Sequence, residues 1–471
     1  MGYDFVPFPR ARKDPNILST PELQAPPEGS DGGNELDRLK AEIVRLREQL
    51  ATTERIYAHF VPQQLLQFLS IRNIRDIRLG LQTERRMTVL FSDIRDFTHL
   101  SESMTPQENF NFLNSYLSQM EPVISLHRGV IDKYIGDAIM ALFPDSADDA
   151  VLGAIAMLER LDAYNHGRNR AGYIPMRIGI GINTGHVMLG TVGGSGRMDG
   201  TVISDSVNVA ARLEELTKTW GVPLLISEHT LHSLENPQRY QIRFIDRLRL
   251  KGKNEPQSVY EVYDGDPAPL RQAKARNQRQ FEEALACYHL REIPQARTRL
   301  LACLADAPGD VPARIYLDRC DDYLRTGHYE SAGDSSLAPD WTEAFSSGSS
   351  EIDAPHRIML NQIGMLATAI RDGHAPQIDD LIEHIRQHAV EHFDAEEADM
   401  QMHGYAFLPE HVQQHRRFIR SLDDLHGRFK QGGDDPLYLA FQVKLHLSDW
   451  LINHSLKFDR HLIQSVRQRD A

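Results

Sequence analysis

Cysteine is scarce in this sequence, and long hydrophobic runs are absent. The three cysteines, Cys287, Cys303 and Cys320, fall in one helical segment and form no CxxC pair. This spacing excludes a disulfide framework and a thiolate-rich metal site, so we expect three buried, small apolar side chains. No apolar run approaches the roughly 20 residues of a membrane span, and the start of the chain lacks the apolar core of a signal peptide. The sequence therefore predicts a cytoplasmic protein with no membrane segment.

Basic residues are also fewer than acidic residues. The chain has 52 Lys and Arg against 66 Asp and Glu, which gives a formal net charge of −14. Because a nucleic-acid backbone is bound by clustered Lys and Arg, this balance argues against a nucleic-acid partner and against binding to an anionic membrane. The 471 residues exceed one ordinary core, and such a length predicts about three folded units.

The N-terminal part of the chain changes character near residue 36. Residues 1–35 are rich in Pro, Gly and polar residues, which predicts a disordered arm. Residues 36–82 are interpreted as a coiled coil and linker helix, because apolar side chains recur three and four apart at Leu36, Leu39, Ile43, Leu46 and Leu50. Two heptads are marginal on their own, so a single amphipathic helix is the alternative to a parallel dimer.

Residues 83–265 alternate apolar strands with amphipathic helices, which predicts an α+β domain on one largely antiparallel sheet. The expected order begins with the strand RRMTVLFSDI, the helix PQENFNFLNSYLSQMEPVISLH and a hairpin, GVIDKYIGDAIMALF, that turns at residues 135–137. A helix near 147–165, the strand pair MRIGIGIN and HVMLGTVG, and a helix over 206–220 follow, and PLLIS, RFIDRLRL and SVYEVYD close the sheet. We interpret VGGSGRMDG as a flexible turn.

The rest of the chain is predicted to be helical. Residues 266–327 resemble one tetratricopeptide-like unit and its continuation, and we interpret them as a helical connector, followed by a polar linker over 328–350. Residues 351–466 give four amphipathic segments broken by DGHAP, HGYAFLP and QGGDDP, which predicts an all-α four-helix bundle.

Two aspartates of the α+β segment occupy positions where a cation could be held. Asp93 ends the strand in LFSDI, and Asp137 lies in the hairpin turn of KYIGDA. A carboxylate at a strand end and another at a tight turn can converge on one cation or on a pair. Aspartates are also common in turns for local hydrogen-bonding reasons, so these two positions alone leave both interpretations open.

Four motifs in this segment, FSDIRDFT, DKYIGDAIMALF, MRIGIGINTG and TVISDSVNVAARLE, occur in an order that resembles the class III nucleotide cyclases. The resemblance implies that Asp93, Ile94 and Asp137 hold two Mg²⁺ (or Mn²⁺) ions, which activate the ribose 3′-hydroxyl and bind the triphosphate of the substrate. It also implies that the site is shared across a homodimer, with the metal aspartates from one subunit and the base-reading and transition-state residues from the other.

The same resemblance assigns the residues that contact the nucleotide. Asn208 and Arg212, one turn apart on a helix, would orient the ribose and stabilise charge developing on the α-phosphate. Arg177 and Lys251 match the phosphate-binding positions of the family, with Lys253 as the alternative to Lys251.

The base is expected to be read by Lys133 and Thr201. Adenine offers an acceptor at N1 and a donor amine at N6, which suits a Lys donor beside a hydroxyl acceptor, whereas guanine would prefer a carboxylate in the first place. Guanylyl cyclases typically carry Glu and Cys at these two positions, so the resemblance favours ATP over GTP.

Two residues depart from the family pattern. Asp96 replaces a Gly in a phosphate-facing loop and adds a negative charge, and Ser204 replaces a frequent Gly.

Histidine is unevenly distributed, because twelve of the 21 histidines follow residue 350. In HAVEHFDAEEADM, residues 388–400, His392 and Glu396 lie on one face of the expected helix. The alternative for this stretch alone is a charged face in water. The other helices offer donors too, at His356, at His411 and His415, and at His454 and Asp459. The five-residue spacing of the last pair turns about 140° around an α-helix, so both reach one site only with a local distortion.

The sequences IDAPH, HFDAEEADM, HVQQH and WLINHSLKFD resemble the bacterial haemerythrins in order and spacing. The resemblance implies a di-iron centre with His356 and His392 on one iron, and His411, His415 and His454 on the other. Glu396 and Asp459 would bridge the irons with an oxo or hydroxo group, and Leu451 would line an apolar O₂ pocket. The remaining histidines of the bundle, including His384, His388 and His461, are expected to be exposed or to lie outside the ligand set.

These observations predict a homodimeric adenylyl cyclase that converts ATP to cyclic AMP and diphosphate, with activity set by O₂ or redox state at the di-iron domain. Two alternatives remain open at this point. One is an iron- and O₂-binding protein with a degenerate cyclase domain, for which Asp96 is the suspect residue, and the other is a guanylyl cyclase with the same sensor.

Overall fold

In this computed structural model the described residues are 32–60, 68–69, 76–194, 197–249, 256–329 and 341–470. The chain divides into two compact units, residues 1–61 and 62–471. Most of the predicted arm, much of the polar linker and the predicted phosphate ligand Lys251 with its alternative Lys253 lie outside the described residues.

The described part of the first unit is the helix α1, Gly32–Phe60. Its predicted seam residues are exposed in the single chain, at 57% for Leu39, 50% for Ile43, 52% for Leu46 and 45% for Leu50. These half-exposed Leu and Ile side chains form one stripe along α1. Because pairing with a second helix would cover this stripe, it favours a pair of such helices over a solitary one.

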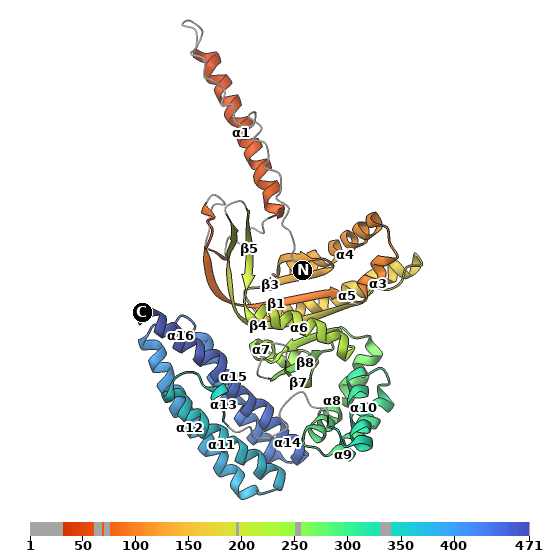
Figure 1. Cartoon of the computed structure of the whole chain (residues 1–471), viewed down its shortest axis with the longest axis vertical. Helices are drawn as coiled ribbons and strands as arrows, with labels where there is room; N and C mark the ends of the chain where they lie inside the picture. Colours follow the sequence, from red (N-terminus) through yellow and green to blue (C-terminus); the bar gives the residue numbers. More distant parts are fainter. Residues whose placement is uncertain are drawn as a thin grey trace, which may run out of the picture. The chain divides into compact units, whose positions relative to one another are not determined.

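The second unit is built on one sheet with the strand order β2-β3-β1-β4-β6-β8-β7, and β5 pairs with β4 (Figure 1). Every pairing is antiparallel except β4 with β6. The predicted α+β fold on a largely antiparallel sheet is therefore confirmed. The strands are β1 (Gln82–Ile94), β2 (Val130–Ile135), β3 (Ala138–Phe143), β4 (Ile178–Gly194), β5 (Arg197–Ile203), β6 (Leu224–Ser227), β7 (Ile242–Arg249) and β8 (Pro256–Val262).

The prediction of two strands over MRIGIGIN and HVMLGTVG is wrong, because β4 runs through both without a break. Asn183 and Thr184 resemble turn residues in sequence, but neighbouring strands and helices satisfy their side chains. Asn183 Oδ1 accepts a hydrogen bond of 2.7 Å from Ser227, and the Thr184 hydroxyl pairs with that of Thr88 at 2.9 Å. VGGSGRMDG is likewise more than a flexible turn, since it supplies paired residues to β4 and β5 on both sides of residues 195–196.

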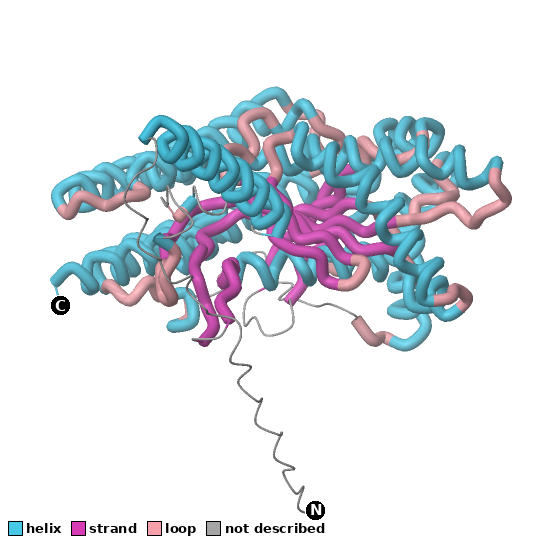
Figure 2. The backbone as a smooth tube through the Cα atoms, turned by 90° about the horizontal axis from the view of Figure 1, so that it is seen from above, coloured by secondary structure: helices cyan, strands magenta, loops and turns pink. Residues whose placement is uncertain are grey.

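Among the described residues, five helices belong to the domain built on the sheet, and Figure 2 shows the strands flanked by helices. They are α3 (Phe97–Glu102), α4 (Pro106–Leu126), α5 (Ala147–Arg170), α6 (Asp205–Trp220) and α7 (Glu228–Ser233). Ser204 caps α6 by accepting a hydrogen bond from the Ser206 amide at 2.7 Å, so this departure from the family pattern has a local role. A Cβ at Gly181 would lie 2.2 Å from the Glu214 amide, so only glycine lets α6 lie this close to β4.

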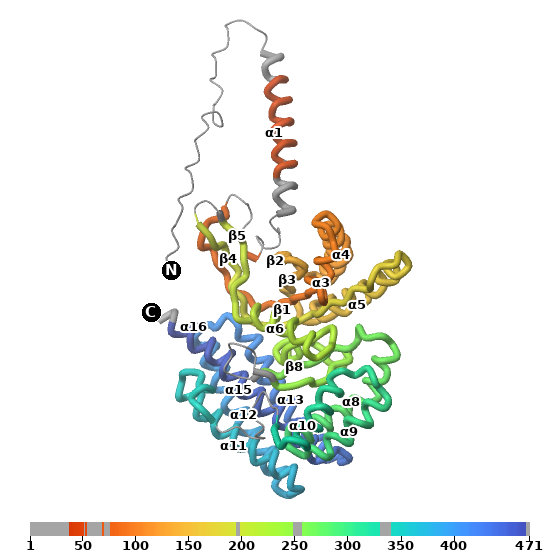
Figure 3. The backbone as a smooth tube through the Cα atoms, turned by 45° about the vertical axis from the view of Figure 1, so that its right-hand side comes forward, coloured from red at the N-terminus to blue at the C-terminus, as the bar shows by residue number. Residues whose placement is uncertain are grey.

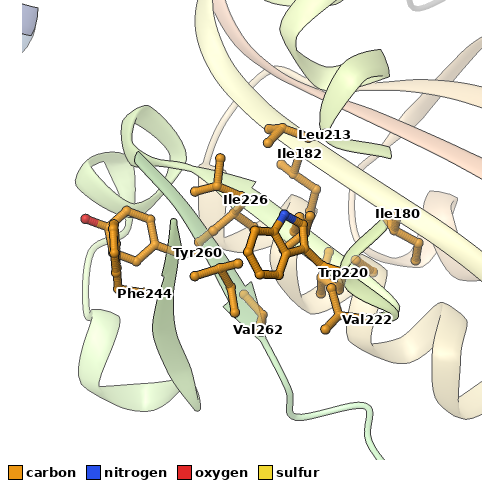
Figure 4. Packing of buried hydrophobic residues seen from close by; sticks show 14 of the residues in the cluster. Ile180, Ile182, Leu213, Trp220, Val222, Ile226, Phe244, Tyr260 and Val262 are labelled. Atoms are coloured by element: carbon orange, nitrogen blue, oxygen red, sulfur yellow. The ribbon is translucent and has the colours of Figure 1, made fainter. Parts of the chain in front are cut away.

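Trp220, at the end of α6, lies in the centre of the main core and is 1% exposed (Figure 4). Its ring stacks on Tyr316, at 5.7 Å between centroids. Tyr316 belongs to a set of three helices, α8 (Ala268–His289), α9 (Ile293–Asp306) and α10 (Val311–Thr326). The segment predicted to be a connector therefore shares one hydrophobic core with the sheet. Cys287, Cys303 and Cys320 are buried in that core, as predicted.

The C-terminal part is a four-helix bundle with its own hydrophobic core, as predicted (Figures 1 and 3). Its first three helices are α11 (Ser350–Asp372), α12 (Ala375–Met402) and α13 (Leu408–Gln431). The fourth runs without interruption through α14 (Pro436–Val443), the π turn η4 (Lys444–Ser448), α15 (Asp449–His454), the π turn η5 (Ser455–Asp459) and α16 (Arg460–Asp470). In the described chain, no helix combines the length and apolar content needed to cross a bilayer.

Candidate functional site

The structure places Asp93 and Asp137 side by side at one edge of the sheet. Asp93 lies near the end of β1, and Asp137 lies in the tight turn between β2 and β3, where Gly136 has a φ of 66°. Burial raises the pKa of Asp137 to about 7, and the hydrogen bond and charge of Asp93 add to this shift. Because two adjacent carboxylates repel each other when both are ionised, the pair suits a bound cation. Ile94, the third predicted metal residue, donates its amide to Asp93 Oδ1 at 3.0 Å.

Lys133 and Thr201, the predicted base-reading pair, also meet. Lys133 Nζ donates a hydrogen bond of 3.0 Å to Thr201 Oγ1, across from β2 to β5. Asp132 lies 3.2 Å from the same ammonium group. The three side chains thus present a donor and a hydroxyl acceptor together, which is the pattern that the adenine edge requires.

Asn208 and Arg212 lie one turn apart on α6, with Asn208 exposed and Arg212 partly buried. Within the described residues of this single chain, no hydrogen bond or ion pair joins them to Asp93 or Asp137. The chain therefore brings Asp93 together with Asp137, and Lys133 together with Thr201. The two predicted transition-state residues are not bonded to the aspartates within the described residues.

Arg177, the predicted phosphate ligand, is paired with an acid of its own chain. Its guanidinium lies 3.4 Å from Asp96 Oδ2, and Lys218 Nζ lies 3.8 Å from Asp96 Oδ1. Asp96 adopts a left-handed backbone conformation with a φ of 57°, which glycine accepts more readily. The departure noted in the sequence thus places a carboxylate beside Arg177, a cation predicted to receive phosphate.

Sequence reasoning missed Glu214 and Arg95, which lie beside the aspartates. Arg95 NH1 lies 3.6 Å from Glu214 Oε1 and its other amino group donates to Thr217. Burial raises the pKa of Glu214 to about 7, and the charge of Asp93 adds to this effect. The position of Arg95, directly after Asp93 and Ile94, was the available signal.

All seven residues predicted to hold iron converge inside the bundle. Four of them, Glu396, His411, His415 and His454, offer ligand atoms within 4.8 Å of one another. His356 Nε2 and His392 Nε2 approach to 2.8 Å at the other end of the cluster. Every member of the set is buried, with exposures of at most 8% for His356, His392, Glu396, His411, His415, His454 and Asp459.

The contacts divide these residues into two groups joined by two carboxylates. His454 Nε2 lies 3.0 Å from His411 Nε2 and 3.1 Å from His415 Nε2, so these three form one group, and His356 and His392 form the other. Glu396 lies 3.6 Å from His392 and 3.5 Å from His411 and His415. Asp459 lies 3.7 Å from His356, 3.3 Å from His411 and 3.1 Å from His454. Each carboxylate therefore reaches both groups, as bridging ligands must.

A π turn places His454 and Asp459 on one face of the helix despite their five-residue spacing. The five residues Ser455–Asp459 form η5, in which hydrogen bonds join residues five apart, so both side chains lie on the same face. The distortion that the sequence required is thus present at the site itself.

The donor set fits a pair of metal ions. The buried oxygens of Glu396 and Asp459 and the Nδ1 atoms of His356, His411 and His454 have no hydrogen-bond partner among the described residues. Burial lowers the pKa of His356, His392 and His454, for His392 to about 3, which keeps these imidazoles in the neutral form that binds metal. Unpaired carboxylates in such a dry site are costly unless cations neutralise them.

Side chains around this cluster include several that the sequence did not single out. Glu397 accepts a hydrogen bond of 2.8 Å from His415 Nδ1 and fixes that ring, as carboxylates often do for metal-bound histidines. Phe393 stacks on His415 and Trp450 on His454, at 4.0 and 4.5 Å between centroids. Leu451, the predicted pocket residue, is buried in the adjacent core.

The bundle contacts the sheet domain next to α6. A cavity of about 280 Å³ is lined from one side by Asp205 and Ser206, in the first turn of α6, and from the other by His454 and Lys457. Asn453 Nδ2 donates to Glu228 Oε2 at 2.8 Å beside this cavity. The helix with the predicted transition-state residues and a predicted iron ligand thus face one common space.

Two family models match separate parts of the chain. The adenylate and guanylate cyclase catalytic domain matches residues 80–263, and the hemerythrin HHE cation binding domain matches residues 347–465. Both resemblances noted in the sequence are therefore confirmed at the level of the domain.

Similar proteins match the first of these regions. An adenylate cyclase of Anabaena cylindrica is 44% identical over 230 residues, which are 48% of this chain and 45% of that protein. A terminal-differentiation specific adenylate cyclase of Dictyostelium discoideum is 34% identical over 279 residues, or 58% of this chain and 13% of that protein. The crystal structure of the adenylyl cyclase CyaB from P. aeruginosa is 32% identical and covers 38% of this chain and 95% of its own, with a TM-score of 0.35. The chain thus spans less than half the length of either curated relative.

Proposed function

We propose that this chain, which combines a class III nucleotidyl cyclase domain with a C-terminal haemerythrin domain, is an adenylyl cyclase controlled by O₂ or redox state at a di-iron centre. The relatives named above support adenylate cyclase chemistry. The observation that carries the control is the cavity shared by the first turn of α6 and His454.

In the proposed reaction, the ribose 3′-oxygen forms a bond to the α-phosphorus of ATP while the bond to diphosphate breaks. Asp93, Ile94 and Asp137 would hold two Mg²⁺ ions, which would make the 3′-hydroxyl more acidic and offset the charge of the triphosphate. Arg212 stabilises the negative charge that builds on the α-phosphate, and Asn208 orients the ribose.

The remaining site residues would select and position the nucleotide. Lys133 and Thr201 bind the adenine edge, and their existing hydrogen bond pre-orients both groups. Arg177 and Lys251 bind the outer phosphates. Because no hydrogen bond or ion pair among the described residues joins Asn208 or Arg212 to the aspartates of their own chain, we expect a second copy to complete the proposed site.

The haemerythrin domain would supply the sensor. Bound iron provides the redox chemistry, while the chain supplies neutral imidazoles, two bridging carboxylates and a dry aromatic wall around them. A ligand changes activity only if it binds two conformations unequally. The cavity between α6 and the bundle offers a physical route for that difference, because a shift of His454 would change the surroundings of Asp205 and Ser206.

The deciding experiment measures cyclic AMP formation by the iron-loaded, full-length protein, first reduced without O₂ and then in air. Iron content and the visible spectrum are recorded on the same samples. A rate that changes with the spectrum supports the proposal. Equal rates would remove the sensor while leaving both sites intact.

A second candidate is an iron- and O₂-binding protein whose cyclase half is inactive. The specific observation in its favour is Asp96, which pairs with Arg177 in the predicted phosphate site. Turnover of ATP and GTP with Mg²⁺ and with Mn²⁺ separates these candidates and also tests the guanylyl alternative. Turnover of ATP at a measurable rate excludes the inactive form.

A further inference from the structure

The contact between the two domains contains a second cluster of metal-ligating side chains, distinct from both sites above. Glu84 on β1, His186 on β4 and His461 on α16 offer ligand atoms that all lie within 4.8 Å of one another. Glu84 and His461 are 377 positions apart in the chain, and the fold alone brings them together.

We propose that Glu84, His186 and His461 bind a divalent transition-metal ion that ties the cyclase sheet to the last helix of the haemerythrin bundle. Two imidazoles and one carboxylate form a common ligand set for such ions, with a further position left to water or another ligand.

The distances fit one ion. Glu84 Oε1 lies 3.0 Å from His461 Nε2 and 3.5 Å from His186 Nδ1. Ligand atoms about 2.0–2.2 Å from a common Zn²⁺, at tetrahedral or octahedral angles, are separated by about 3.0–3.5 Å. Because the lone pair of an imidazole nitrogen lies in the ring plane, the stacked rings of His186 and His461 must also turn toward an ion held between the three atoms.

The surroundings of the two rings support a ligand function. Tyr405 Oη lies 2.7 Å from His461 Nδ1, so the ring can donate there and leave Nε2 as the acceptor that faces Glu84. His186 Nδ1 is buried and makes no hydrogen bond within the described residues. A buried ring nitrogen without a partner is costly, and a metal ion would satisfy it.

The position is shielded on one side and accessible on the other. Phe407 packs edge-on against His186, at 4.5 Å between centroids, and the His186 and His461 rings stack at the same distance. Both histidines also line the 280 Å³ cavity, which can supply a water molecule to the ion. Arg86 also lines this cavity, and its guanidinium donates a hydrogen bond of 2.6 Å to the Ser233 hydroxyl.

The test uses full-length protein already loaded with iron, so that the di-iron ligands are filled. Zn²⁺ binding is measured by equilibrium dialysis and elemental analysis in excess Mg²⁺. Wild type is expected to bind one more Zn²⁺ per chain than His186→Phe, which keeps the ring contacts but has no nitrogen donor. Tyr405→Phe should keep the site with about tenfold weaker affinity, the usual effect of losing an outer hydrogen bond.

Two controls separate loss of a ligand from loss of structure. Glu84→Gln keeps the side-chain size at a partly exposed position and should also lose the ion, whereas His166→Phe, an exposed histidine of α5, should not. Iron content must stay the same in every variant, and Co²⁺ should give a visible spectrum in wild type that both ligand variants lack. Equal Zn²⁺ stoichiometry and affinity in wild type, His186→Phe and Glu84→Gln would overturn the proposal, whatever the cyclase activity.

Discussion

Asp96 holds its carboxylate 3.4 Å from the guanidinium of Arg177, in the loop that follows the end of β1 at which Asp93 lies. The pair is exposed, with 58% of the Asp96 side chain and 77% of the Arg177 side chain accessible to solvent. If Arg177 binds a nucleotide phosphate as proposed, Asp96 would compete with that phosphate for the same guanidinium.

Replacing Asp96 by Gly should lower the KM for ATP by about two- to fivefold, because an exposed ion pair is worth about 0.5–1 kcal/mol. The same change should raise the melting temperature, since Gly accepts a φ of 57° without strain. Steady-state kinetics and thermal unfolding measure the two effects. Asp96→Asn is the matched control, because it removes the charge but tolerates the backbone. An unchanged KM in both variants would show that Asp96 does not oppose the phosphate.

Two inactive variants should restore activity when mixed. Asp93→Ala removes a metal ligand and Asn208→Ala removes a transition-state residue, and each homodimer should be inactive. If the site is shared across a two-fold dimer, random exchange gives half heterodimers with one intact site each, so about a quarter of the wild-type rate returns. The rate of cyclic AMP formation is measured before and after subunit exchange. No recovery, with exchange verified by mass spectrometry, would contradict a shared site.

Metal binding at the cyclase site should depend on pH near neutrality. With its pKa raised to about 7, Asp137 keeps its proton up to that pH, and the proton must leave before a cation binds. The apparent affinity for Mn²⁺ should fall up to about tenfold per pH unit below 7 and level off above it. Titrations followed by electron paramagnetic resonance measure this in nucleotide-free protein. Asp137→Asn should abolish the dependence, whereas Asp145→Asn, at an exposed position, should not.

Lys133 and Thr201 should determine the base. The double variant Lys133→Glu with Thr201→Cys reverses the donor pattern, so the ratio of kcat/KM for ATP over GTP should fall at least about tenfold, as expected when a hydrogen-bonded site is left unmatched. The single variants should lose ATP turnover without gaining GTP turnover. A ratio that stays constant would assign base selection to other residues.

The contact between Asn453 and Glu228 should carry part of the response to O₂. Glu228 is buried in the sheet domain, and its Oε2 accepts a hydrogen bond of 2.8 Å from Asn453 of the bundle, so this bond links the two domains directly. Asn453→Ala should keep full iron content and cut the ratio of the two cyclase rates, in air and without O₂, by several-fold. His384→Ala, at an exposed position of α12, is the matched control. An unchanged ratio in both would place the coupling elsewhere.

Local patterns in the sequence predicted most of the elements. The hairpin turn at residues 135–137, the strand before Asp93 and the helix of Asn208 follow from periodicity and turn chemistry, and the structure has each of them. The break predicted between MRIGIGIN and HVMLGTVG is absent from β4, where Asn183 and Thr184 find hydrogen-bond partners on β6 and β1. A residue's own chemistry cannot reveal a hydrogen bond supplied from another strand.

The candidate sites also contain some features that the local sequence predicts and others that only the structure shows. The donors of the bundle and their grouping into two sets could be predicted, because helical spacing and the resemblance to a family are both local signals. His461 had no such signal, and its partners on β1 and β4 lie in a different domain. Contacts between domains depend on how two surfaces fit, which no short stretch of sequence encodes.

The π turn over Ser455–Asp459 contains one residue more than an ordinary α-helix would use to place His454 and Asp459 on the same face. Deleting one of residues 455–458 would give these two residues the four-residue spacing of His411 and His415, which an α-helix already places on one face. The residues that follow, including His461 beside Glu84, would then keep nearly the same orientation. One added residue would instead turn everything that follows by about 100°, with a shift of about 1.5 Å, so Asp459 would leave the buried histidines. The last helix should therefore tolerate a single-codon deletion within this turn better than a single-codon insertion.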